Sequence, residues 1–197
     1  MIRRNAIPDP APMTATSDRP EPAAPTGGPA WADQIHAVLS ANRVRQVALV
    51  PDAGHARLID LCRADAAMRV VPLTTEEEGV ALLAGAWLGG EKGVLLMQSS
   101  GVGNCVNMLS LTRICAFPLL ILVTMRGEWG EFNPWQVPMG RSTPAVLEAA
   151  GVIAQRVSDP DEVRPAVEAA ARLAFSGPHA VAVLLSQRLI GAKRWVK

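Results

Sequence analysis

Six short apolar runs alternate with helix-like segments along the chain, and this alternation limits the possible folds more than any other feature. Most of the runs are continuously apolar, as expected of strands that are buried on both faces. They span residues 46–51, 68–73, 93–98, 119–125, 153–157 and 180–185. Strands that alternate with helices form parallel sheets with helices packed on the faces. The sequence therefore predicts an α/β fold: a doubly wound, mainly parallel six-stranded sheet with helices on both faces.

The segments between the runs have helical periodicity. We expect helices over residues 31–42, 55–64, 76–88, 105–115, 143–150 and 160–175. The 76–88 segment is apolar nearly all round, which predicts a buried helix whose Gly79 and Gly85 closely approach another backbone. The six residues SSGVGN before the 105–115 helix are expected to form a tight turn. Residues 126–141 are rich in Gly and Pro and are expected to form a long functional or mobile loop.

Length and composition predict one compact domain over residues 31–190, because 197 residues can bury a sizeable core. Residues 1–30 are rich in proline and have no apolar period, so they are predicted to be a flexible extension. Residues 191–197 form a short tail. The 19 basic and 18 acidic residues are scattered, which argues against nucleic-acid binding.

The sequence also argues against a membrane location. Residues 1–30 lack the apolar run of a secretory signal, and no apolar run reaches the about 20 residues that cross a bilayer. The three cysteines include no C-x-x-C pair and lie in apolar segments, so we expect buried, reduced thiols. These features predict a cytoplasmic protein.

Ligands of parallel sheets bind beyond the carboxyl ends of the strands, so the candidate site lies in the loops that follow them. These loops are residues 51–55, 74–78, 98–104 and 126–140. Gly101 and Gly103 share part of the dinucleotide fingerprint, but Val106 replaces its third glycine and no acidic residue follows about 20 positions on. A tight turn against some other ligand is the preferred interpretation.

Three glutamates, residues 76–78, open the apolar helix that follows the second strand. Acidic residues in a first helical turn interact favourably with the helix dipole, and this explanation is preferred for Glu77 and Glu78. Glu76 directly follows the strand end and would enter the site of a sheet wound as predicted. A carboxyl group in such a place suits proton transfer. Helix register leaves open whether Glu76 or Glu77 has this role.

These segments resemble the pyrimidine-binding domain of thiamine-diphosphate-dependent decarboxylases. The likeness rests on EEEGVALLAGAWLGG and LLMQSSGVGN, and it extends to VPD at residues 50–52 and RGEWGEFNPWQVPMG at residues 126–140. It covers most of residues 31–188. The chain is most similar to sulfopyruvate decarboxylase alpha subunits and to phosphonopyruvate decarboxylases.

The resemblance implies roles for particular residues. In that family a glutamate, usually nine residues before a glycine in an alanine-glycine-aromatic element, hydrogen-bonds the cofactor's pyrimidine nitrogen and so promotes loss of its reactive proton. Counting back from Gly85 gives Glu76. The implied cofactor-binding residues are Pro51, Glu76, Gln98, Ser99, Ser100, Gly101 and Asn104. Asp52, His55, Arg126 and Gln136 lie on the site loops and are candidates for binding substrate.

The family holds the diphosphate and Mg²⁺ on a second domain that contains Gly-Asp-Gly, which this sequence lacks. The resemblance therefore implies a beta subunit with that domain, and thiamine diphosphate with Mg²⁺ bound between the two chains. The implied reaction is decarboxylation of a small anionic 2-oxo acid, such as 3-sulfopyruvate or 3-phosphonopyruvate, by a hetero-oligomer that is active only with both subunits. A carboligase (synthase) subunit and a non-catalytic binding or regulatory subunit remain alternatives.

Overall fold

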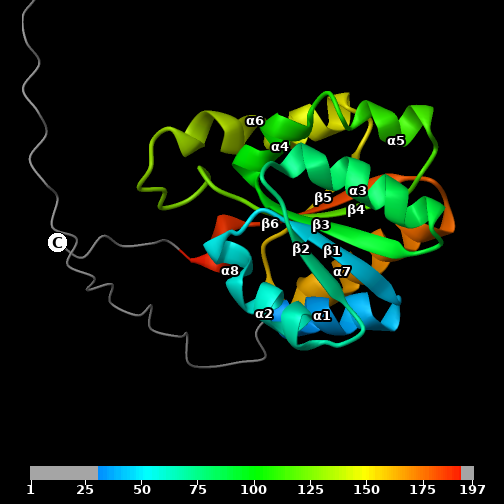
Figure 1. The fold of residues 1–197 in the computed structure, drawn as a ribbon. Helices are drawn as coiled ribbons and strands as arrows, with labels where there is room; N and C mark the ends of the chain where they lie inside the picture. Colours follow the sequence, from blue (N-terminus) through cyan, green and yellow to red (C-terminus); the bar gives the residue numbers. More distant parts are fainter. Residues whose placement is uncertain (1–30, 192–197) are drawn as a thin grey trace, which may run out of the picture.

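A computed structural model describes residues 31–191 and shows a central sheet between two layers of helices (Figure 1). The predicted extension, residues 1–30, and residues 192–197 of the predicted tail lie outside the described residues. The rest of the chain forms one continuous sheet with its covering helices.

All six predicted strands are confirmed, with ends that differ from the prediction by at most two residues. They are β1 (Val44–Leu49), β2 (Arg69–Pro72), β3 (Lys92–Gln98), β4 (Leu119–Thr124), β5 (Ile153–Val157) and β6 (Ala180–Leu185). Their order in the sheet is β2-β1-β3-β4-β6-β5, and every neighbouring pair is parallel. The predicted doubly wound α/β fold is therefore correct.

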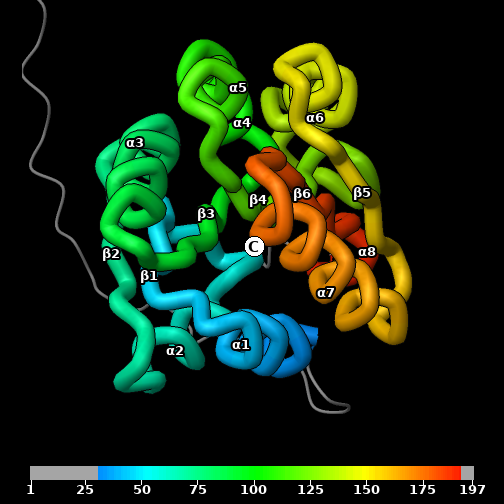
Figure 2. The backbone as a smooth tube through the Cα atoms, turned by 90° about the vertical axis from the view of Figure 1, so that its right-hand side faces the viewer, coloured from blue at the N-terminus to red at the C-terminus, as the bar shows by residue number. Residues whose placement is uncertain are grey.

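Helices cover both faces of the sheet (Figure 2). One face carries α1 (Trp31–Ala41), α2 (Ala56–Ala64) and α7 (Pro160–Ser176), and the other carries α3 (Glu76–Leu88), α4 (Ser99–Cys105), α5 (Ser110–Ile114) and α6 (Gln136–Ala149). The short helices η1 (Ala53–His55) and α8 (Gln187–Ile190) follow the carboxyl ends of β1 and β6.

The apolar runs supply two cores because successive strand residues point to opposite faces. In β3, Val94 and Leu96 pack with α1, α2 and α7, while Leu95 and Met97 pack with the helices on the other face. A strand whose side chains pack into a core on each face needs apolar residues at every position, which explains the continuous runs.

The order of the strands reverses at β1 and so creates a place for a ligand. The chain runs from β1 outward to β2 and then returns past β1 to β3. Such a reversal separates the loops that follow the two inner strands and leaves a crevice at their carboxyl ends. Pro51 and Asp52 follow β1, and Gln98 ends β3, so these predicted site residues lie at this crevice.

The turn predicted for residues 99–104 is wrong. Ser99–Cys105 is itself helical, as α4, and the helix predicted over residues 105–115 is reduced to the short α5. Gly101 is needed there because the Glu76 side chain packs against it: a Cβ added at Gly101 would lie 2.5 Å from the Glu76 carboxyl carbon. Glycine in α4 thus permits a close approach and does not form a turn.

The loop after β4 is shorter than predicted because α6 begins at Gln136 instead of residue 143. Pro138 lies in the first turn of α6, where a missing N–H leaves no helical hydrogen bond unmade. The helix also accommodates Pro144. Gly140 lets α6 approach the backbone of Arg126 closely, since a Cβ at this position would collide with the Arg126 carbonyl group. Pro138, one of the two prolines that suggested a loop, therefore lies inside a helix.

The prediction that α3 is buried on all sides is also wrong. Gly79, Val80 and Leu83 are buried against the sheet, whereas Gly85 and Leu88 are exposed, Leu88 to 87%. Gly79 does approach the Leu95 side chain closely, but a Cβ added at Gly85 would meet no described atom within 4 Å. One side of this apolar helix thus has no cover in the described part of the chain.

Two of the three cysteines agree with the prediction. Cys62 and Cys105 are buried, and burial raises the pKa of both thiols to about 12. Cys115 is exposed at the end of α5, so the prediction of a buried thiol is wrong for this residue. Among residues 31–191, no helix combines the length and apolar character that a bilayer crossing requires.

Candidate functional site

Glu76 is the one glutamate of the acidic triplet that points into the molecule. Its exposed fraction is 7%, whereas Glu77 and Glu78 are exposed. Glu78 supports the helix start, because its Oε2 accepts a hydrogen bond of 2.9 Å from the Thr74 backbone N–H. Thr75 is the N-cap residue, although its side chain makes no capping hydrogen bond. The register of α3 therefore separates the three glutamates as the sequence suggested.

Helix α4 holds the Glu76 carboxyl group from two sides. The backbone of Gly101 lies against its carboxyl carbon and Oε1, and the Asn104 side-chain amide donates a 2.7 Å hydrogen bond to Oε2. Oε1 accepts no hydrogen bond from the described residues and is not a buried, unpartnered atom. One carboxyl oxygen is thus fixed and the other is accessible.

The residues at the end of β3 lie beside this carboxyl group. Gln98 is the N-cap residue of α4, and its buried Oε1 has no hydrogen-bond partner among the described residues. Ser99 is buried and accepts a 3.1 Å hydrogen bond from the Arg126 backbone N–H through Oγ. Ser100 is half-buried. The end of β3 is thereby tied to the segment after β4.

Asp52 lies at the wall of a small cavity between the carboxyl ends of β1, β4 and β6. Its Oδ2 accepts hydrogen bonds from the Thr124 hydroxyl, at 2.6 Å, and from the Gly54 backbone N–H, at 3.1 Å. The cavity has a volume of about 170 Å³, and its walls include Arg126 and Gln187. Ligand pockets for larger molecules have about 300–1,000 Å³, so this cavity suits a small molecule. Glu76 does not line it.

Two of the predicted residues near β1 lie apart from this cavity. Pro51 is exposed and does not line it. His55 is 1% exposed, and its Nε2 lies 3.2 Å from the Leu122 carbonyl oxygen. Burial lowers the pKa of the imidazole, so the ring is neutral at neutral pH. His55 therefore packs under the sheet edge, away from the cavity.

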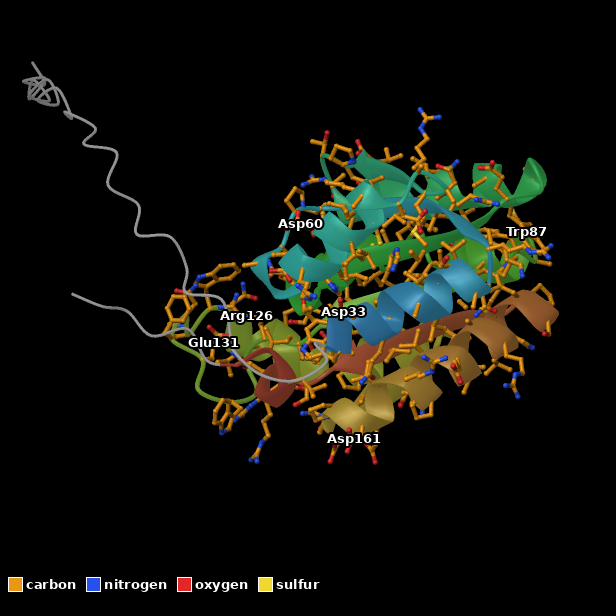
Figure 3. All side chains as sticks on the ribbon, turned by 90° about the horizontal axis from the view of Figure 1, so that it is seen from below. Asp33, Asp60, Trp87, Arg126, Glu131 and Asp161 are labelled. Atoms are coloured by element: carbon orange, nitrogen blue, oxygen red, sulfur yellow. The ribbon has the colours of Figure 1, made fainter. Side chains whose placement is uncertain are left out.

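Arg126 lines the cavity but is already paired with an acidic residue. Its Nε and Nη2 donate hydrogen bonds of 2.8 and 2.7 Å to the two carboxyl oxygens of Glu131, a two-pronged ion pair. The side chains are 14% and 4% exposed. Figure 3 shows both residues together at one end of the molecule, far from Trp87 at the other end. The charge of Arg126 is largely neutralised within its own loop.

Glu131 also organises the loop after β4. Its oxygens accept hydrogen bonds from the backbone N–H groups of Gly127 and Asn133 and from the Gln187 side-chain amide. The Arg126 guanidinium and these N–H groups lower the pKa of the Glu131 carboxyl to about 2. Gln187 in turn accepts from two backbone N–H groups of the loop. The predicted long loop is thus held in a defined conformation.

Gln136, a predicted substrate residue, is 2% exposed at the start of α6, and its buried Oε1 has no partner among the described residues. Sequence reasoning missed Thr124, Glu131 and Gln187. No local pattern marks Thr124 or Gln187, because their partners Asp52 and Glu131 lie 72 and 56 positions away in the sequence. Glu131 was visible only as one residue of the loop segment RGEWGEFNPWQVPMG.

The site offers hydrogen-bond acceptors more than charge. Glu76 Oε1 is accessible and lacks a donor among the described residues, so a ligand with an N–H group could satisfy it, whereas Gln98 Oε1 and Gln136 Oε1 also lack donors but are buried. Within residues 31–191, no group of three His, Cys, Asp or Glu side chains could hold a metal ion. The accessible Glu76 carboxyl oxygen is thus the atom of this site that fits a ligand with an N–H group.

Comparison with known proteins finds clear sequence relatives. Sulfopyruvate decarboxylase subunit alpha of Methanococcus maripaludis is 33% identical over 154 residues, which are 78% of this chain and 92% of the relative. The protein of the same name from Methanothermobacter thermautotrophicus is 38% identical over 69% of this chain and 83% of its own length. Phosphonopyruvate decarboxylase of Streptomyces viridochromogenes is 39% identical over 59% of this chain, but only 30% of the enzyme is covered. No model of a protein family matches the chain.

A solved structure shares the fold. It is 2-oxoglutarate:ferredoxin oxidoreductase from Magnetococcus marinus, with a TM-score of 0.65 over 82% of this chain and 29% of the other chain. The sequences are 15% identical, so this likeness concerns the fold alone.

Proposed function

The chain belongs to the family of sulfopyruvate decarboxylase alpha subunits, and on that premise we propose that it is the alpha subunit of a two-subunit, thiamine-diphosphate-dependent decarboxylase of a small 2-oxo acid. The observation that carries the proposal is the Glu76 carboxyl group: it is buried at the strand-order reversal and has one accessible oxygen. A carboxyl group so placed can exchange a proton with a ring nitrogen. The cytoplasmic location predicted from the sequence is part of this proposal.

Glu76 and the residues at the start of α4 would hold the pyrimidine half of the cofactor. Gln98, Ser99, Ser100 and Gly101, at the end of β3 and the start of α4, would form the adjoining surface. When bound, thiamine diphosphate supplies a carbon nucleophile and an electron sink for decarboxylation. The residues of this chain orient the ring and exchange a proton with it at Glu76 Oε1. Mg²⁺ and the diphosphate would be held by the beta subunit.

Two observations support a partner chain. The relatives of similar length are named alpha subunits, whereas the alignment with the Streptomyces enzyme covers only 30% of that protein and leaves room for a second domain within one chain. The apolar α3 also presents an uncovered side that includes Gly85 and Leu88. A large apolar side chain left as exposed as Leu88 on an apolar helix is a candidate contact for another chain. We place the beta subunit against this side of α3, next to Glu76 at the helix start.

Replacing Leu88 with lysine is expected to weaken binding of the beta subunit at least tenfold. Leu88 is 87% exposed, so the change costs the isolated chain little, and a positive charge near a helix C-terminus is favourable. In the complex, the same lysine would bury a charge in an apolar contact. The measurement is the Kd between the purified subunits.

Leu173→Lys is the matched control, because Leu173 is 41% exposed on α7, which covers the opposite face of the sheet (Figure 2). This variant should bind the beta subunit like the unmodified chain. Equal binding by the Leu88 variant would show that the partner lies elsewhere.

The cavity beside Asp52 would receive the substrate. Its about 170 Å³ suits a molecule of a few carbon atoms, and Thr124, Arg126 and Gln187 offer polar groups in its wall. Arg126 is engaged by Glu131, so its attraction for a sulfonate or phosphonate is reduced. We therefore expect the beta subunit to contribute part of the positive charge that such an anionic group requires.

Reconstitution tests the function directly. The chain alone should release no carbon dioxide from any 2-oxo acid, and co-expression with the chain encoded beside it should yield a complex that does so with thiamine diphosphate and Mg²⁺. The screen should include 3-sulfopyruvate, 3-phosphonopyruvate and pyruvate, with the aldehyde product identified. Activity of the isolated chain would reject the two-subunit proposal. A ligated product would indicate a carboligase, and cofactor binding without turnover would indicate a non-catalytic subunit.

A further inference from the structure

We infer that Asn104 is a positioning residue that fixes the orientation of the Glu76 carboxyl group and reserves Oε1 for the cofactor. This inference rests on the proposed function, since it assigns roles to the two oxygens of the proposed proton carrier. The resemblance placed Asn104 among residues that contact the cofactor. The geometry gives it a different role, exerted through Glu76.

The geometry leaves the carboxyl group little freedom. Glu76 comes from α3, while Gly101 and Asn104 lie three positions apart on one face of α4. Gly101 blocks one side of the carboxyl group, with 2.5 Å between its would-be Cβ and Glu76 Oε1. Asn104 Nδ2 lies 2.7 Å from Oε2 on the other oxygen. Rotation about the carboxyl bond would break this hydrogen bond.

The chemistry of the asparagine side chain determines which oxygen can carry a proton. An amide nitrogen only donates, so Oε2 serves as the acceptor in this pair. A proton on Oε2 would require the Asn104 amide to turn and present its oxygen, whereas a proton on Oε1 leaves the observed hydrogen bond intact. Oε1 has no donor among the described residues. Proton exchange with the ligand therefore occurs at Oε1.

No other contact of Asn104 explains why an asparagine stands at this position. The residue is exposed, and among residues 31–191 its side chain makes only the hydrogen bond to Glu76. Its backbone needs no asparagine, because it lies inside α4. The amide group is therefore available for this one interaction.

The first test concerns the hydrogen bond and needs no cofactor. In the full-length chain, the side-chain amide signals of Asn104, assigned by their absence in Asn104→Ala, should shift as Glu76 is titrated. They should not shift in Glu76→Gln over the same pH range. If the Asn104 amide signals do not change with the protonation of Glu76, the inference is wrong. This holds whether or not the chain is a decarboxylase subunit.

The second test concerns the consequence in the reconstituted complex. Asn104→Ala should slow both turnover and the exchange of the cofactor C2 proton for deuterium about tenfold, with KM for the 2-oxo acid unchanged, because a hydrogen bond to a charged group is lost. Asn104→Asp should exchange best at low pH, where the new carboxyl group is protonated and can donate, and should lose this advantage as the pH rises. Asn107→Ala is the matched control, since Asn107 is exposed two residues after α4 and its side chain makes no hydrogen bond to the described residues.

The outcomes separate the inference from the proposed function. Exchange by Asn104→Ala at the rate of the unmodified complex, or the same pH dependence for the alanine and aspartate variants, would overturn the role of Asn104. If the unmodified complex neither binds thiamine diphosphate nor exchanges its C2 proton, the proposed function fails, and the first test alone decides whether Asn104 holds Glu76.

Discussion

Replacing Glu76 with glutamine is expected to lower the turnover of the reconstituted complex by about 10²- to 10⁴-fold, the usual range for loss of a general acid or base. Glutamine has nearly the same shape, so it can still lie against Gly101 and accept from Asn104 through its amide oxygen. It cannot exchange a proton with the cofactor. The loss should therefore appear in kcat and in C2-proton exchange, while the unfolding temperature and the binding of the beta subunit change little.

Glu77→Gln is the matched control for this result. Glu77 is adjacent in sequence and exposed, so its replacement should leave kcat within about twofold. A large loss in the Glu77 variant with full activity in the Glu76 variant would reverse the assignment. Full activity in both would remove the proposed mechanism.

A second change at the same place tests the geometry. Gly101→Ala puts a Cβ about 2.5 Å from the Glu76 carboxyl carbon, which is closer than a Cβ approaches a non-bonded atom in proteins. The carboxyl group must then leave the position in which Asn104 donates to it. An alanine variant that folds but exchanges the cofactor proton slowly would show that the position of Glu76, as well as its presence, determines the rate.

The strands could be predicted because they depend on a local pattern, whereas the sequence left the choice between Glu76 and Glu77 open and only the structure shows which of the two is buried. Strands buried on both faces need continuous apolar runs. Glu76 is the first residue of α3, and the register of the helix turns it inward while Glu77 and Glu78 stay exposed. The helical state of residues 99–105 could not be predicted, because Gly101 is there to admit a side chain from α3. Only the folded arrangement reveals that need.

The uncovered side of α3 was mispredicted for a related reason. An apolar helix must be covered, and the sequence does not say whether its own chain or another provides the cover. The structure covers Val80 and Leu83 but leaves Leu88 exposed. The exposed Leu88 on this apolar helix is therefore the main structural argument for a partner chain.

Glu131 has both local and long-range hydrogen-bond partners, and only the local ones could be expected from the sequence. Its five hydrogen bonds come from Arg126, Gly127 and Asn133 nearby and from Gln187, which follows β6. Nothing in the sequence links Gln187 to this loop. The parallel sheet places β4 and β6 side by side, and their following segments meet at the carboxyl edge.

Replacing Glu131 with alanine is expected to lower the free energy of unfolding by about 3 kcal/mol, the lower end of the range for breaking a buried ion pair, since Arg126 keeps some contact with solvent. The change would leave the Arg126 guanidinium and the Gln187 amide without their acceptor. Urea denaturation at neutral pH measures the effect. Glu168→Ala breaks the exposed Arg164–Glu168 pair on α7 and should cost no more than about 1 kcal/mol, so it serves as the control.

The pH dependence of stability provides an independent check on the same ion pair. The folded state lowers the pKa of Glu131 from an ordinary value of 4.5 to about 2. A carboxyl group with a depressed folded-state pKa contributes stability above its unfolded pKa and loses it as the pH falls towards the folded value. The difference in unfolding free energy between the unmodified chain and Glu131→Gln should therefore be constant from pH 7 to about pH 5 and shrink steadily from about pH 5 to pH 3. A difference that stays constant down to pH 3 would mean that Arg126 does not stabilise the charged form of Glu131, and that other contacts hold the loop beside the Asp52 cavity.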